Sequence, residues 1–272
     1  MKKPLTTFTI MPVLFLGHGS PMNAIEDNEF SRGWQKASLS LPRPDAILCI
    51  SAHWETEGTK VTAMEKPKTI HDFGGFPREL YEVQYPARGS KWLAQEVKET
   101  VKKTVVEFDG EWGLDHGCWS VLSRMYPAAD VPVVQLSIDA NKSPKEHFDL
   151  AKDLSPLRDK GVLIVGSGNI VHNLGLIEFR GDSPDDFNKP FGFDWAIEAS
   201  NLIKRLIKEE KFGKLVDYQS LGRDVRLAVP TNEHYLPMLY ALGLKREAES
   251  VEFFNDKPVA GSLTMTSMII TT

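Results

Sequence analysis

Four histidines in this chain of 272 residues each follow closely on a run of apolar residues. The runs read VLFLG before His18, AILCISA before His53, VLIVGSGNIV before His172 and VRLAVPTNE before His234. One histidine at the end of such a run is most often a packed, hydrogen-bonded residue. Four histidines, each at the end of an apolar run, favour a divalent metal site, because neutral imidazole is a common metal ligand.

The apolar runs themselves predict buried β-strands, because they are rich in Val, Ile and Leu and are followed by Gly, Ser or Pro. They cover residues 13–17, 46–51, 131–138, 162–166 and 225–229. A looser alternation in residues 250–254 and 262–270 predicts additional strands at the edge of the sheet.

Amphipathic stretches between these runs indicate helices over residues 90–103, 144–157, 194–210 and 234–242. The second begins with Ser143, Pro144 and Glu146, which have the spacing of a helix N-cap with a capping box. Strands that alternate with helices are typical of an α/β fold with a mostly parallel central sheet covered by helices on both faces. Since no repeat or linker-like segment divides the chain, the sequence predicts a single domain over residues 1–272.

The carboxyl ends of parallel strands meet at one edge of a sheet, and open α/β sheets bind their ligands in the crevice there. We therefore expect the four histidines to converge at this edge and form the metal site. Residues 55–89 show no clear strand or helix period and are dense in Gly, Pro and aromatic residues. A loop of this length in a compact domain is usually functional, so we expect it to form a lid or wall of the pocket.

The other histidines carry weaker signals. Asp115 and His116 lie between two glycines, and they form either a catalytic dyad or a surface turn. His147 is expected on the solvated face of a helix, and His71 either lines the pocket or bonds loop backbone. The GSGN sequence at 166–169 resembles a phosphate-binding loop but lacks the spacing of the common nucleotide motifs.

Composition excludes several classes of partner. Lys and Arg number 32 against 37 Asp and Glu, which gives a net charge of -5 and does not suggest binding to nucleic acid or to an anionic membrane. No apolar run has the length of a membrane span. The two cysteines, Cys49 and Cys118, lack a metal-binding or disulfide spacing, which indicates a reducing, cytoplasmic location.

Seven motifs, in order from residue 14 to residue 240, together resemble the 4,5-DOPA extradiol dioxygenase family. This family is a branch of the class III extradiol ring-cleavage dioxygenases and is related to the catalytic subunit of protocatechuate 4,5-dioxygenase. The motifs are LFLGHGSPM (14–22), SAHWET (51–56), IHDFGGFP (70–77), LYEVQYPA (80–87), GLDHG (113–117), GSGNIVHNL (166–174) and HYLPMLY (234–240).

The resemblance implies an enzyme with one divalent metal per chain that uses dioxygen to open a catechol ring, such as that of L-DOPA, beside its hydroxyls. The product is a muconic semialdehyde. Fe(II) supports this activity, and Zn(II) is also found in the site of family members. A facial set of three protein ligands leaves metal positions open for the catechol and for dioxygen.

Residue roles follow from the same motifs. The resemblance implies that His18 and His53 are metal ligands and that His234 stands where many class III enzymes have a glutamate, which puts strict iron selectivity in doubt. His172 matches an acid/base histidine close enough to count as a fourth metal neighbour. His116, with Asp115, matches the second acid/base position, and the sequence does not decide which histidine is the acid and which the base.

Substrate contacts are expected from Tyr235, Arg78 and Tyr85, which lie in or near the motifs, although each also fits a packing or surface role. Two other functions use the same histidines: a zinc-dependent hydrolase in which the metal activates water, and a non-enzymatic protein whose histidines fill the whole coordination shell. The chain is expected to be a monomer or a small homo-oligomer.

Overall fold

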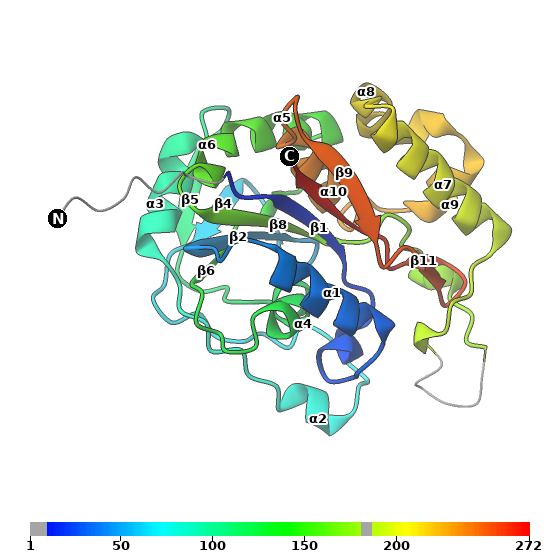
Figure 1. Cartoon of the computed structure of the whole chain (residues 1–272), viewed down its shortest axis with the longest axis horizontal. Helices are drawn as coiled ribbons and strands as arrows, with labels where there is room; N and C mark the ends of the chain where they lie inside the picture. Colours follow the sequence, from blue (N-terminus) through cyan, green and yellow to red (C-terminus); the bar gives the residue numbers. More distant parts are fainter. Residues whose placement is uncertain (1–9, 181–186) are drawn as a thin grey trace.

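The computed structural model describes residues 10–180 and 187–272, and its centre is a six-stranded sheet (Figure 1). The strand order is β6-β2-β8-β1-β12-β9. The strands are β1 (Val13–Gly17), β2 (Ala46–Ser51), β6 (Val133–Gln135), β8 (Val162–Gly168), β9 (Ser250–Phe254) and β12 (Ser267–Thr271). The first four in this order are parallel, and β12 and β9 pair antiparallel. The predicted α/β fold with a mostly parallel sheet is confirmed.

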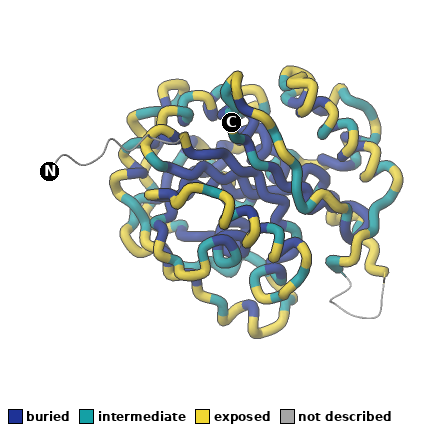
Figure 2. Tube along the Cα trace, viewed as in Figure 1, coloured by how far each residue is buried: buried dark blue, intermediate teal, exposed yellow. Residues whose placement is uncertain are grey.

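Side chains of each strand alternate between the two faces of the sheet, because successive residues of a strand point in opposite directions. Val13 and Phe15 belong to the core on the face covered by α5 (Pro144–Asp153) and α10 (Leu236–Gly243). Leu14 and Leu16 belong to the core under α1 (Glu29–Ser40) and α4 (His116–Met125). Figure 1 shows these helix pairs on opposite sides of the strands, and Figure 2 shows the strands as the buried centre of the molecule.

The remaining elements surround this core. The helices are α2 (Arg78–Tyr81), α3 (Lys91–Thr100), α6 (Ser155–Arg158), α7 (Asp194–Lys208), α8 (Phe212–Val216) and α9 (Arg223–Ala228), with short 3-10 helices η1 (Pro21–Ala24), η2 (Leu174–Leu176) and η4 (Tyr218–Leu221). Short strands form pairs outside the main sheet: β3 (Glu55–Thr56) with β7 (Ile138–Asp139), β4 (Thr59–Thr62) with β5 (Val106–Asp109), and β10 (Pro258–Val259) with β11 (Leu263–Thr264). In the described residues no helix is both long and apolar enough to cross a membrane.

Helix α5 begins as its sequence predicts. The Ser143 hydroxyl accepts a hydrogen bond from the Glu146 amide, and the Glu146 side chain accepts one from the Ser143 amide. This capping box satisfies two backbone donors that a helix start leaves without partners.

Three predicted strands differ in the structure. The segment 262–270 is divided between β11 and β12, and β12 lies between β1 and β9 instead of at the edge of the sheet. The run at 225–229 lies in helix α9 and its C-terminal boundary, where Val225 and Ala228 are buried on one face. A five-residue apolar run does not distinguish a strand from one buried face of a helix, so the prediction was wrong. The run at 131–138 is divided between β6 in the main sheet and β7, which pairs with β3 outside it. His234 therefore follows a helix and a turn instead of a strand.

His147 is buried, so the prediction of a solvated surface position is wrong. Its Nε2 donates to the carbonyl oxygen of Asp139 at 3.2 Å, and its Nδ1 accepts from the Tyr240 hydroxyl at 2.9 Å. The residue lies where α5 packs against α10, and this contact covers the helix face that the sequence suggested was open to water.

Burial at this position predicts a pH-dependent stability. Burial lowers the pKa of His147 from its usual value near 6.5 to about 4, so between these values the unfolded chain binds a proton that the folded chain does not. The free energy of unfolding should therefore fall as the pH drops through this window, by about 2 to 3 kcal/mol from this residue. His147→Gln should reduce the fall by that amount, measured by urea unfolding at pH 7 and pH 4.5. An equal fall in both proteins would contradict this prediction.

Candidate metal centre

The predicted histidines converge at the carboxyl edge of the parallel strands. His18 directly follows β1, His53 follows β2 by two residues, and His172 follows β8 by four. His234 reaches the same place from the turn before α10. These four and His116 line one cavity of about 820 Å³.

Three of the rings form a nearly equilateral triangle. The ring centroids of His18 and His53 are 5.0 Å apart, those of His18 and His234 are 5.2 Å apart, and those of His53 and His234 are 4.9 Å apart. Three imidazoles at such equal separations from three different elements have the arrangement of a facial ligand set.

Polar contacts of Nδ1 in His18 and His53 leave Nε2 of each ring facing the other. The Ser167 hydroxyl donates to the Gly117 carbonyl oxygen, so it accepts from Nδ1 of His18, at 3.0 Å. In a neutral ring the lone pair is then on Nε2, which lies 3.2 Å from Nε2 of His53. Nδ1 of His53 instead faces Oδ2 of Asp72 at 3.6 Å. Two imidazole nitrogens turned toward each other in this way are stabilised by a shared cation, so the residues present fit a metal ion.

The protonation of these rings also suits metal binding. Burial, followed by repulsion from neighbouring histidines, lowers the pKa of His18 and His234 well below the usual value. The same causes lower the pKa of His53 to about 3, and burial lowers that of His172 to about 4. These four rings are therefore neutral at pH 7 and offer lone pairs to a metal.

His234 is oriented by a carboxylate that the sequence analysis missed. Its Nδ1 lies 3.1 Å from Oε1 of Glu233, so the carboxylate accepts the Nδ1 proton and leaves Nε2 with the lone pair. The ring of His172 stacks on that of His234, with centroids 3.5 Å apart and planes 6° from parallel. In the sequence, only the position of Glu233 directly before His234 could have indicated that Glu233 orients the His234 ring.

The glycines of GSGN serve close packing of backbone, not phosphate binding. The Asn169 amide donates to the His234 carbonyl oxygen at 2.8 Å. A Cβ atom on Gly168 would lie 2.2 Å from the same oxygen, which is too close for any side chain. The end of β8 and the backbone of His234 are therefore held against each other.

His116 pairs with Asp72, and not with Asp115 as the sequence suggested. The His116 amide donates to Oδ1 of Asp72 at 2.8 Å, and Nδ1 of the ring lies 2.9 Å from Oδ2. Although burial of Asp72 favours its neutral form, these hydrogen bonds hold its pKa below the usual value. Asp72 lies within IHDFGGFP, but it was not predicted as a site residue because nothing in the sequence links it to His116.

Asp115 has a structural position beneath the site. It caps α4 by accepting from the Cys118 amide, and it also accepts from the Ser51 hydroxyl and the Gln135 amide group, each at 2.6 Å. Its side chain is fully buried, and burial raises its pKa. The predicted dyad of Asp115 and His116 is therefore replaced by the dyad of Asp72 and His116.

Within residues 10–180 and 187–272, two groups of potential ligand atoms are compact enough to hold a metal. The ligand atoms of His18, His53 and His116 all lie within 4.8 Å of one another, and so do those of His172, Glu233 and His234. The first group makes His116 a geometric alternative as a ligand. Assignment of His18, His53 and His234 as ligands, with His172 as a fourth neighbour, stays a prediction.

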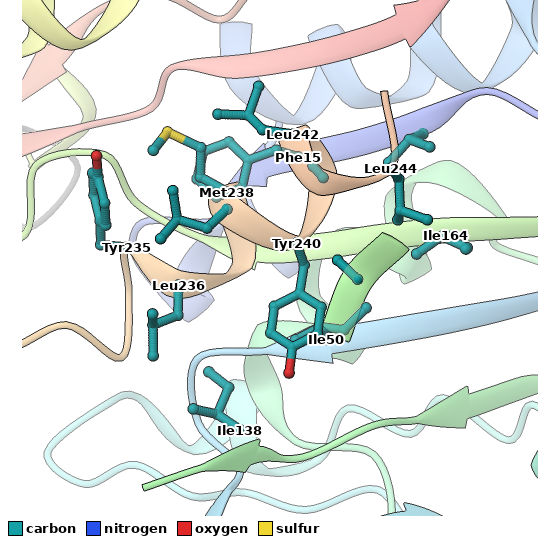
Figure 3. Close-up of a cluster of buried hydrophobic side chains, with 14 of the residues drawn as sticks. Phe15, Ile50, Ile138, Ile164, Tyr235, Leu236, Met238, Tyr240, Leu242 and Leu244 are labelled. Atoms are coloured by element: carbon teal, nitrogen blue, oxygen red, sulfur yellow. The ribbon is translucent and has the colours of Figure 1, made fainter. Parts of the chain in front are cut away.

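The three expected substrate contacts lie outside the residues that line the cavity. The Tyr235 hydroxyl donates to the Leu215 carbonyl oxygen, and its ring lies among buried apolar side chains (Figure 3). The Tyr85 hydroxyl donates to the Tyr126 carbonyl oxygen. Arg78 is exposed and pairs with Glu82. We therefore do not retain these residues as substrate contacts.

The long segment 55–89 supplies one wall of the cavity, in agreement with the prediction that it forms a lid or wall. Its residues 72–77 include Asp72, Phe73 and Phe76 in the lining. Phe179 and Phe187 lie on the cavity as well. His71, from the same segment, does not line the cavity, and its Nε2 donates to the Val83 carbonyl oxygen at 3.0 Å. The cavity is an apolar, aromatic chamber with a cluster of histidines, which suits an aromatic ligand.

Comparison with known proteins supports the same interpretation. Residues 12–268 match the family described as the catalytic LigB subunit of aromatic ring-opening dioxygenase. A protein named 4,5-DOPA dioxygenase extradiol from Escherichia coli K12 is 46% identical, over 99% of this chain and 98% of its own length. A protein of the same name from Beta vulgaris is 35% identical over 91% of each chain. The crystal structure of an uncharacterized Escherichia coli K12 protein superposes with a TM-score of 0.81 at 43% identity, covering 95% of this chain and 99% of that one.

Proposed function

Because this chain belongs to the family of catalytic LigB subunits of aromatic ring-opening dioxygenases, we propose that it cleaves a catechol beside its hydroxyls. The family comprises extradiol dioxygenases that depend on a non-haem metal. The proposed substrate is a catechol of the DOPA type, cleaved between carbons 4 and 5 with dioxygen as co-substrate to give a muconic semialdehyde. The observation that carries the proposal is the triangle of neutral imidazoles from His18, His53 and His234 at the floor of an aromatic cavity.

The metal proposed here is Fe(II), held by these three histidines. An Fe(II) ion held there would supply the Lewis acidity and the redox chemistry that reaction of a catechol with dioxygen requires. Zn(II) fits the same donor set but does not undergo redox change. A preparation isolated with Zn(II) should therefore be inactive until its metal is exchanged.

The other two histidines have separate proposed roles as base and acid. A catechol loses protons as it binds a metal, and a neutral imidazole can accept one. His172 is neutral and lines the cavity, which makes it a candidate for this base. His116 can retain a proton on Nδ1 through its bond to Asp72, so that Nε2 can exchange a proton with substrate. We propose that these two residues share the proton transfers of the reaction.

The hydrolase alternative is not favoured, because the matched family opens aromatic rings with dioxygen. We further propose that the chain is a single catalytic domain, because the site draws its histidines from residue 18 to residue 234. A cytoplasmic location is also proposed, supported by Cys49 and Cys118, which are both free and buried.

Anaerobic reconstitution tests the proposed function directly. The metal-free protein is loaded with Fe(II), mixed with L-DOPA without oxygen, and then exposed to air. We expect uptake of one dioxygen per catechol and a yellow ring-cleavage product, since both oxygen atoms enter the product. The same protein loaded with Zn(II) should show neither signal. Absence of oxygen uptake across a panel of catechols, with iron demonstrably bound, would refute the proposal.

A further inference from the structure

Two buried serines lie side by side below the histidine cluster. Ser51 is the last residue of β2 and Ser167 the second-last of β8, and these two positions pair in the parallel register of the strands. Both side chains point to the face of the sheet that α4 covers, because each continues the alternation of core residues under that helix. Both are fully buried. Two hydroxyls are thus enclosed between the carboxyl edge of the sheet and the first turn of α4.

The Ser167 hydroxyl joins a proposed metal ligand to this helix. It accepts from Nδ1 of His18 at 3.0 Å and donates to the carbonyl oxygen of Gly117, in the first turn of α4, at 2.5 Å. A hydroxyl can take both roles at once, because it has one proton and two lone pairs. The Gly117 carbonyl therefore sets the direction of the Ser167 proton, and the Ser167 lone pair sets which nitrogen of His18 keeps its proton.

The Ser51 hydroxyl makes the equivalent connection for a second proposed ligand. It accepts from the His53 amide at 3.3 Å and donates to Oδ1 of Asp115 at 2.6 Å. The same Oδ1 accepts from the Cys118 amide and so caps α4. A single carboxylate oxygen thus fixes the start of the helix and, through one serine, the backbone of His53.

The start of α4 is also packed directly against these residues. A Cβ atom on Gly117 would lie 2.4 Å from Oγ of Ser51 and 2.8 Å from Cδ2 of His53, which is too close for a side chain. Gly117 directly follows His116, the proposed acid/base residue at the start of the helix. The two serines and this glycine therefore hold the His116 ring at a fixed position relative to the proposed ligands.

We propose that Ser167 and Ser51 are positioning residues that join the metal ligands to the start of α4. Ser167 presents Nε2 of His18 to the metal, and Ser51 fixes the backbone that carries His53. The inference rests on the proposed function, because it takes these two histidines as metal ligands. Partners that orient a ligating histidine typically contribute about 10- to 100-fold to metal affinity.

The variant Ser167→Ala tests the inference through the affinity for Zn(II), which fits the donor set and has no redox chemistry. In this variant Nδ1 of His18 loses its acceptor, while Asp115 still caps α4, so the protein should fold. We expect the Kd of Zn(II), measured by competition with a chelator, to rise by about 10- to 100-fold. Ser51→Ala should raise it by less than about tenfold, because that serine binds backbone and not the ring. An unchanged Kd in either variant would overturn the inference for that serine.

A proton resonance distinguishes positioning from a general loss of stability. In the Zn(II)-loaded protein the Nδ1 proton of His18 is buried and hydrogen-bonded to Ser167, so NMR should show it as a slowly exchanging signal. This signal should be lost in Ser167→Ala and persist in Ser51→Ala. The matched control is Ser137→Ala, which removes a buried hydroxyl that accepts from the Lys60 amide and lies outside the cavity lining. An equal rise of Kd in this control, or an unchanged signal in Ser167→Ala, would overturn the inference.

Metal binding and ring cleavage can fail separately in these experiments. If Ser167→Ala weakens Zn(II) binding but the unaltered, Fe(II)-loaded protein opens no catechol, the positioning role is supported and the proposed function fails. If rings are opened but Zn(II) binds equally well to the unaltered protein and to Ser167→Ala, the proposed function stands and the positioning role is overturned.

Discussion

Replacement of His53 by alanine is expected to abolish metal binding and, with it, ring cleavage. His53 has its Nε2 only 3.2 Å from that of His18, and its ring is a corner of the histidine triangle. Loss of a group that merely orients a ligand lowers metal affinity by about 10- to 100-fold, so loss of the ligand itself should exceed about 100-fold. Anaerobic titration calorimetry with Fe(II), and the metal content after gel filtration, measure this effect.

The matched control for this experiment is His71→Ala. His71 is a histidine of the same loop-rich region, but it bonds backbone and does not line the cavity. The control should bind one metal per chain with the affinity of the unaltered protein. If His53→Ala also bound one metal per chain with that affinity, His53 would have to be removed from the ligand set.

The second large effect is expected for His116→Ala, which should keep the metal and lose turnover. The His116 ring lies 3.8 Å from that of His53 and is held by Asp72, so it can exchange protons with a bound catechol. Loss of a general acid or base typically lowers kcat by about 10²- to 10⁴-fold. Stopped-flow measurement of product formation, together with metal analysis of the same sample, tests the prediction.

The variant Asp72→Asn tests the dyad while every histidine of the site stays in place, and metal content is measured on the same sample because Asp72 also faces Nδ1 of His53. An amide in place of the carboxylate can donate to Nδ1 of His116, which moves the ring proton to Nε2 and should lower kcat by about 10- to 100-fold.

Two results for His116→Ala would contradict its proposed role. Loss of the metal would make His116 a ligand, which its position near His18 and His53 allows. Retained turnover would remove it from the reaction.

The convergence of His18, His53 and His172 was predictable because it follows from the topology of the parallel strands that precede them. Parallel strands place their carboxyl ends at one edge, so His18 and His53 had to meet once β1 and β2 joined the same parallel sheet. His234 was correctly predicted to lie at the site, but one premise of that prediction was wrong, because the apolar run before it forms helix α9 and not a strand. The contact of its backbone with the end of β8 brings it to the site.

The partners of these histidines were not predictable in the same way. Asp72 and Asp115 are both acidic residues near His116, and adjacency in sequence favoured Asp115. The fold decides otherwise, because Asp115 is used to cap α4 and Asp72 reaches over from the 55–89 segment. Tyr235 illustrates the same limit, since its position beside His234 in the sequence says nothing about the direction of its side chain. In the structure that side chain points into the core (Figure 3).

The position of β1 in the sheet has a consequence for how the protein matures. β1 lies between β8 and β12, with Val13 paired to Ile164 on one side and to Ile270 on the other. The strand that precedes His18 therefore gains its second neighbour only after β12 (Ser267–Thr271) has been synthesised. Pairing across such a sequence distance is slow to form. We expect a stable metal site to require β12, because β1, which ends beside His18, lacks one of its two neighbours until β12 has paired with it.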